Sequence, residues 1–158
     1  MNSKGFTLIE LVVVIVILGV LAVSAVPKYI NLQADARTAT LEGVKAAMQG
    51  ASALVYGKSL VAGNQKLSAT NNPKPTITLS DGTELDIHYG YPRFTAADWQ
   101  SILDLDSNDF SMSMTRDAKL IIFPESFGFI SSVSADCIVI YQQATATHVP
   151  VITVNPCV

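Results

Sequence analysis

The sequence predicts an α+β fold in which one long N-terminal helix packs on a mostly antiparallel β-sheet. Three observations predict it: an apolar run opens the chain, a helical repeat of apolar residues follows, and short alternating segments fill the chain after Pro75. Consecutive strands joined by short links pair antiparallel by default. The order of these elements therefore favours one helix followed by a sheet.

The composition indicates a single folded unit and excludes some classes of protein. The 158 residues match the length of about one domain, and 49% of them are apolar, so the chain is too apolar to be disordered. The formal net charge is -3, which lacks the basic footprint of a nucleic-acid-binding domain. We therefore expect no nucleic acid partner.

The first element is an apolar segment from Phe6 to Val26. A helix of this length would reach roughly 31 Å, close to the ~30 Å hydrocarbon thickness of a bilayer. We therefore predict a membrane-spanning helix over residues 6–26. A conventional cleaved secretory signal is the alternative, because Ala22, Ser24 and Ala25 resemble its cleavage site. The length of the run and the presence of Glu10 count against that alternative.

Glu10 is the most informative residue of the segment, because an ionisable side chain in a membrane helix is costly and is usually kept for a role. Its position near one end lets it reach the headgroups, which is the structural alternative. The surrounding sequence is MNSKG followed by FTLIELVVVIVILGVLAVSAVPKYINLQADAR. This stretch of about 35 residues resembles the N-terminal signature of type IV prepilins and of the pseudopilins of type II secretion.

The resemblance implies a processing route for residues 1–26. Residues 1–5 would be a leader peptide, a prepilin peptidase would cut after Gly5, and the new N-terminal Phe6 would be N-methylated. Residues 6–26 would anchor the precursor in inner-membrane lipid as a single pass with a cytoplasmic N-terminus. Lys4 supports that orientation by the positive-inside rule.

The resemblance also implies the partners and the final location. The subunit would polymerise with other pilin subunits at an inner-membrane assembly platform, and residues 6–26 would then form the core of an extracellular pilus that contacts extracellular surfaces. Its fold would be the type IV pilin fold, closed by a C-terminal disulfide.

Phe6 and Glu10 are the residues that we predict to act in subunit assembly. Cleavage after Gly5 would create an α-ammonium group on Phe6, one helical turn from the Glu10 carboxylate. A lone carboxylate in a water-free filament core is costly, so it needs a cation from its own chain or from a neighbour. A neighbour's Phe6 would fix the axial register between subunits.

The helix is expected to continue beyond the apolar segment as an amphipathic half over residues 27–57. Leu41, Val44, Met48, Ala51 and Val55 recur at steps of three and four, which is typical of one buried helix face. We therefore predict one helix that begins at Phe6, continues to about Val55 and stops near Gly57.

Two kinds of residue modify this long helix. Gly19 and Pro27 are its weak points, because both residue types disfavour a helix interior, and the resemblance implies that the segment between them loses helical structure on assembly. Small residues crowd residues 43–53 and permit close approach of another backbone. Their partner is either the chain's own sheet or an adjoining subunit, and we expect the sheet.

Residues 58–158 are predicted to form a β-rich head. A loop occupies residues 59–75, and a hairpin follows in which residues 77–79 and 85–87 alternate around an Asp81–Gly82 turn. Thr95 is expected to cap a short helix that contains Trp99. Residues 119–123, 137–141 and 149–154 are predicted to be strands.

Cys137 and Cys157 are predicted to form a disulfide. They lie in the part of the chain that the topology places outside the cytoplasm, where oxidising conditions favour pairing. Two buried free thiols are the alternative. The resemblance implies the same pairing, because the family closes its C-terminal region, here residues 137–157, with a disulfide.

No catalytic or cofactor-binding set is predicted. His88 and His148 are isolated, and neither a Ser-His-Asp set nor a glycine-rich phosphate loop is present in the sequence. The segment from Asp104 to Asp109 begins like a calcium loop. Asp109 stands where an EF-hand needs glycine and Thr115 where it needs glutamate, so we predict no EF-hand and no metal site, with only a weaker calcium loop left open.

Two longer stretches sharpen the resemblance. PKYINLQADARTATLEGVKAAMQGASALVYGK and DCIVIYQQATATHVPVITVNPC are similar to the mannose-sensitive haemagglutinin pilins of aquatic Gammaproteobacteria. The resemblance implies a non-enzymatic major structural subunit of a pilus that serves surface attachment, adhesion and biofilm formation. A type II secretion pseudopilin and a membrane-anchored periplasmic binding domain are the alternatives.

Overall fold

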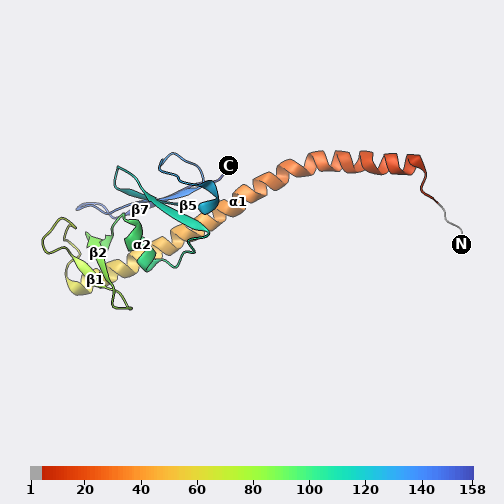
Figure 1. The fold of residues 1–158 in the computed structure, drawn as a ribbon. Helices are drawn as coiled ribbons and strands as arrows, with labels where there is room; N and C mark the ends of the chain where they lie inside the picture. The colour runs from red at the N-terminus through yellow and green to blue at the C-terminus, as the bar shows by residue number, and fades with distance from the viewer. Residues whose placement is uncertain (1–4) are drawn as a thin grey trace.

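The computed structural model describes residues 5–158, with the side chains of residues 24–31 outside the described part. A long helix projects from a β-rich head that packs along its C-terminal half (Figure 1). The elements in chain order are α1 (Leu8–Ala62), β1 (Thr76–Thr78), β2 (Glu84–His88), β3 (Tyr91–Pro92), α2 (Ala96–Ile102), β4 (Phe110–Met114), β5 (Lys119–Pro124), the 3-10 helix η1 (Glu125–Phe127), β6 (Ile138–Gln142) and β7 (Val151–Asn155). The α+β prediction is confirmed.

Helix α1 is fixed at both ends by its own sequence. Thr7 is the N-cap, and its hydroxyl oxygen accepts a hydrogen bond from the Glu10 N–H at 3.4 Å. Glu10 Oε2 in turn accepts from the Thr7 N–H at 2.8 Å, which completes a capping box. Gly63 ends the helix with φ 71, a left-handed conformation that glycine adopts without strain. The helix therefore runs past the Gly57 boundary that the sequence suggested.

The two predicted weak points lie inside a continuous helix. The backbone of α1 is helical at both Gly19 and Pro27, and the Pro27 side chain lies outside the described residues. The side chains of residues 24–26, at the end of the predicted membrane span, are also outside the described part of the chain. Among the side chains that the structure does describe, no helix is both long enough and apolar enough to cross a membrane.

The head contains two antiparallel sheets. The smaller has strand order β1-β2-β3 and the larger β4-β5-β6-β7. The predicted hairpin is present as β1 and β2, with Ile77 opposite Leu85, although its connection is longer than the expected two-residue turn. Strands β3 and β4 were not predicted, and the alternating residues of β4, FSMSM, were the available signal.

The core of the head lies between one face of α1 and the larger sheet. Leu41, Val44 and Met48 of α1 are buried against Trp99 of α2 and Tyr141 of β6. The following polar contacts close this core: Trp99 Nε1 donates to the Arg93 carbonyl at 2.9 Å, and the Tyr141 hydroxyl donates to the Pro92 carbonyl at 2.6 Å. One face of α1 is thereby committed to the head, which leaves the opposite face available.

Candidate functional site

The N-terminal part of α1 exposes apolar side chains all around the helix. Leu8 is 80% exposed and Val23 78%, and every residue between them is exposed. Monomeric soluble proteins rarely expose a contiguous apolar surface of this size, and larger ones mark protein or membrane contacts. We call residues 8–23 the stalk. Its surface requires a covering that the isolated chain does not supply.

The residues predicted for processing and assembly lie at the start of the stalk. Gly5 and Phe6 precede the helix, and the Phe6 side chain is 88% exposed. The Glu10 carboxylate lies one turn into α1 and also accepts a hydrogen bond from the Thr7 hydroxyl at 2.7 Å. Among the side chains that the structure describes, no cation forms an ion pair with Glu10. The carboxylate is therefore held in place by Thr7 without a charged partner.

A second exposed surface runs along α1 beside the head. Its residues recur at steps of three and four, so they share one helix face, and all of them are exposed. We call it the small-residue face, and it consists of Leu32, Ala36, Ala39, Gly43, Ala46, Gly50, Leu54, Gly57 and Val61. It lies opposite the buried Leu41, Met48 and Val55. The chain's own sheet therefore leaves this face uncovered.

The glycines of this face are not required by packing within the chain. A Cβ atom built at Gly43, Gly50 or Gly57 would meet no other atom within 4 Å. These three glycines follow one another at intervals of seven residues. The expectation that the small residues pack on the sheet is wrong for most of them, because Ala51 is half-buried and Ser52 buried, whereas the other small residues of 43–53 are exposed. Helical periodicity alone does not say which of two faces is buried.

The C-terminal disulfide is present, as the sequence predicts. It joins the buried Cys137, just before β6, to Cys157 after β7. The Cys157 N–H donates to the Thr38 hydroxyl oxygen at 2.9 Å, across a sequence separation of 119 residues. The disulfide therefore links the start of β6 to the end of β7 in the larger sheet. The hydrogen bond to Thr38 holds the end of the chain on α1.

Removal of this disulfide is expected to destabilise the head. In the chain-entropy model a loop of this length contributes about 3 kcal/mol. The double variant Cys137→Ser/Cys157→Ser should therefore lose about that much free energy of unfolding, measured by urea denaturation of the full chain in detergent. Wild-type protein under a reducing agent should shift its midpoint by a similar amount, and an unchanged midpoint in both experiments would contradict the expectation.

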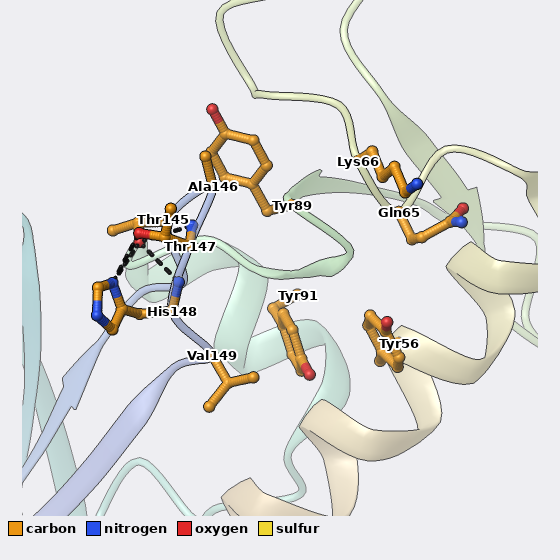
Figure 2. Close-up of a pocket in the computed structure, with 10 residues that line it drawn as sticks. All are labelled: Tyr56, Gln65, Lys66, Tyr89, Tyr91, Thr145, Ala146, Thr147, His148 and Val149. Atoms are coloured by element: carbon orange, nitrogen blue, oxygen red, sulfur yellow. Dashed lines mark hydrogen bonds between the residues drawn. The ribbon is translucent and has the colours of Figure 1, made fainter.

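A pocket of about 440 Å³ lies between the C-terminal part of α1 and the connection between β6 and β7. Figure 2 shows Tyr56 of α1 beside Tyr91 of β3, and their rings stack with centroids 4.7 Å apart. The opposite wall is the connection between β6 and β7, where the His148 N–H donates a hydrogen bond to the Thr145 hydroxyl oxygen. The Gln65 Oε1 atom on its rim is buried and has no hydrogen-bond partner among the described residues. Sequence reasoning did not anticipate this pocket, because its walls come from segments far apart in the chain.

A hydrogen bond to His88 holds the loop that follows α1 against β2. Its Nδ1 accepts a hydrogen bond from the Ala69 N–H at 3.0 Å, which requires the neutral imidazole. Burial, together with the charge of Arg93, lowers the pKa of His88 below its usual value.

The stability of the head is therefore expected to depend on pH through His88. Below about pH 6.5 the unfolded chain takes up a proton that the folded chain binds less readily, so stability should fall as the pH falls toward the lowered folded pKa. His88→Asn keeps a side-chain acceptor without this titration, and should lose less stability than wild type between pH 7.5 and 5.5 in urea denaturation. A pH dependence of His88→Asn equal to that of wild type would contradict this expectation.

The acidic loop between α2 and β4 is held by hydrogen bonds between its own residues. Asp106 Oδ1 accepts hydrogen bonds from the Asn108 N–H at 2.9 Å and from Asn108 Nδ2 at 2.8 Å. Among the residues that the structure describes, no three His, Cys, Asp or Glu side chains are grouped to hold a metal ion.

Comparisons with known proteins agree at the N-terminus. Residues 1–26 match the prokaryotic N-terminal methylation motif. The chain is 46% identical over 54 residues to a type IV narrow pilus major component of Thermus thermophilus, covering 34% of this chain and 47% of that protein. It is 39% identical over 89 residues to a fimbrial protein of Pseudomonas aeruginosa, covering 53% of each chain.

A third relative is a type IV major alpha-pilin of Moraxella bovis, 40% identical over 75 residues, covering 46% of this chain and 47% of that protein. The chain thus spans about half the length of the curated relatives it matches. No solved structure matches it.

Proposed function

We propose that this chain, which has the N-terminal motif and the α+β fold of a type IV pilin, is the major structural subunit of a pilus and polymerises through α1. Its role is structural rather than enzymatic. The observation that carries the proposal is the exposed surface of α1, apolar around the stalk and continued along the head as the small-residue face. Other copies of the same chain would supply the missing cover.

The two parts of this surface suit each other in shape. The stalk carries bulky Val, Ile and Leu side chains, whereas the middle of the small-residue face is formed by alanine and glycine. Small residues let two helices approach closely, and bulky side chains then fill the space between them. The stalk spans about 24 Å and the small-residue face about 45 Å, so parallel copies can overlap along both.

Processing and membrane storage belong to the same proposal. A prepilin peptidase cuts after Gly5, Phe6 is N-methylated, and residues 6–26 hold the precursor in the inner membrane with its N-terminus in the cytoplasm, ready for the assembly platform. The match of residues 1–26 to the methylation motif supports this route, as does the single leader cation, Lys4. The segment between Gly19 and Pro27 is where α1 would unwind on assembly.

The finer proposal is a pilus of the mannose-sensitive haemagglutinin type, which serves surface attachment and biofilm formation. The sequence resemblance at residues 27–58 and 136–157 supports it. Deletion of the gene should reduce early attachment of cells to an abiotic surface, and plasmid-borne expression should restore it. Attachment that is unchanged after deletion would leave a structural pilus subunit without this role.

Mass spectrometry of material sheared from the cell surface tests the main proposal. The expected result is a chain that begins with N-methylated Phe6 and shows the mass deficit of a closed Cys137–Cys157 disulfide. A chain that begins at Met1, or after Ala25, together with an empty sheared fraction, would refute the pilin route. A Gly5→Val variant, whose side chain crowds the proposed cut, should remain in the membrane at its full precursor mass.

A further inference from the structure

An aromatic side chain projects from the stalk end of the head. Phe129 follows η1 and is 83% exposed, whereas its neighbour Phe127 lies under the Arg37 guanidinium, 5.2 Å from the ring centroid. The Gly128 N–H donates to the Glu125 carbonyl at 3.0 Å, which closes the turn before Phe129. The segment is thus anchored to α1 through Phe127, and Phe129 points away from the chain's own core.

A groove of about 350 Å³ lies nearer the far end of the head, between α1 and β7. Its walls are mainly apolar and include Ala53, Tyr56, Tyr91, Val149 and Ile152. It shares Tyr56, Tyr91 and Val149 with the pocket of Figure 2, so the two hollows are adjacent. The groove has the size and the apolar character to accept one aromatic ring.

One of the residues that line this groove has an unpaired polar atom in the isolated chain. Ser52 lines the groove, and its buried Oγ has no hydrogen-bond partner among the described residues. Buried hydroxyls are usually paired, because an unpaired one keeps its desolvation cost. Rotation of the Ser52 side chain would bring this hydroxyl to the backbone N–H and C=O groups of an inserted loop.

The projection and the groove are different surfaces at different positions along and around α1. Successive helical residues turn by about 100°, so Arg37 beneath the projection is about a third of a turn from Gln49 and Tyr56 in the groove. Two different surfaces are what a head-to-tail contact between identical subunits requires, and such contacts build helical filaments.

Resting on the proposed pilus function, we propose that Phe129 of one copy inserts into the groove between α1 and β7 of a neighbouring copy. Arg37 and Ser52 are about 22 Å apart along α1, which sets the axial offset of the two copies. That offset leaves about 60 Å of the two 55-residue helices side by side. The charges beside the two surfaces are opposite in sign, because the acidic Glu125 precedes the projection and the basic Lys66 lines the adjoining pocket.

Cysteine cross-linking in sheared filaments tests this contact. Each copy of the Phe129→Cys/Val149→Cys variant carries both halves of the contact, so mild oxidation should give a ladder of linked subunits on a non-reducing gel. Each single variant should give no ladder. The matched control is Phe129→Cys/Ser80→Cys, because Ser80 is also exposed but lines a different pocket, between α1 and α2. Filaments without a ladder, or an equal ladder from the control pair, would overturn the contact and leave the pilus function standing.

A second measurement does not depend on cross-linking. Phe129→Asp should lower the yield of sheared filaments at least tenfold relative to wild type, with unchanged precursor in the membrane, whereas Phe129→Leu should keep most of the yield. Met114→Asp provides a control at another exposed apolar residue of the head, and should have little effect. Wild-type yield from Phe129→Asp would reject the contact, while an absence of filaments from the wild-type chain itself would count against the pilus function instead.

Discussion

Replacement of Glu10 with alanine is expected to stop filament growth while the precursor still enters the membrane and is still cut after Gly5. The Glu10 carboxylate has no cationic partner among the side chains that the structure describes, and a filament core free of water cannot solvate it. The α-ammonium of a neighbouring Phe6 is the cation that assembly would bring to it. Without the carboxylate, the register between subunits is lost, and the yield of sheared filaments should fall at least tenfold.

The capping role of Glu10 must be separated from its charge. Glu10 accepts from the Thr7 N–H and hydroxyl, so alanine also removes half of the capping box, at a cost of about 1 kcal/mol to the helix end. Glu10→Gln keeps an acceptor for Thr7 without the charge, and Thr7→Ala keeps the charge without the cap.

The charge hypothesis expects filaments from Thr7→Ala and none from Glu10→Gln. The opposite pattern would assign the effect to capping. Immunoblots of the membrane fraction, with precursor and cut forms resolved, show whether insertion and processing remain intact in each variant.

The sequence predicts the elements of this fold best where a local signal is strong. The Asp81–Gly82 hairpin and the Thr95-capped helix depend on a few neighbouring residues, and both are present close to their predicted positions. The end of α1 was placed too early, because Gly57 lies in the helix and Gly63 supplies the left-handed cap. A glycine in sequence does not reveal which of its conformations the chain requires.

The candidate site residues also divide into those that a local sequence motif indicates and those that depend on contacts between distant parts of the chain. Gly5, Phe6 and Glu10 lie within one continuous motif, so their roles could be predicted without coordinates and stay predictions. The predicted pairing of Cys137 with Cys157 is confirmed. The groove at Ser52 and the exposure of Gly50 could not be predicted, because they depend on which face of α1 the larger sheet covers. Leu41, Met48 and Trp99 decide that question through contacts between distant parts of the chain.

Enlargement of Gly50 provides the sharpest separation between folding and assembly. A side chain at Gly50 would meet open space in the isolated chain, and glycine in a helix interior is less favourable than other residues by up to about 1 kcal/mol. Gly50→Leu should therefore leave the free energy of unfolding of the full chain in detergent unchanged or slightly raised. In a filament, the same side chain would occupy the space where a neighbouring helix packs, so filament yield should fall at least tenfold.

Gly50→Ala is the matched control for this experiment, because it gains at least as much helix propensity but adds only a methyl group. Its filaments should form at a yield close to wild type. If Gly50→Leu filaments also form normally, the small-residue face does not contact a neighbour, and assembly must depend on the stalk alone. If Gly50→Leu instead unfolds the head, the face is packed within the chain, which the open space around Gly50 argues against. A stable head combined with lost filaments is the outcome that assigns the glycines of α1 to the partner subunit rather than to the fold.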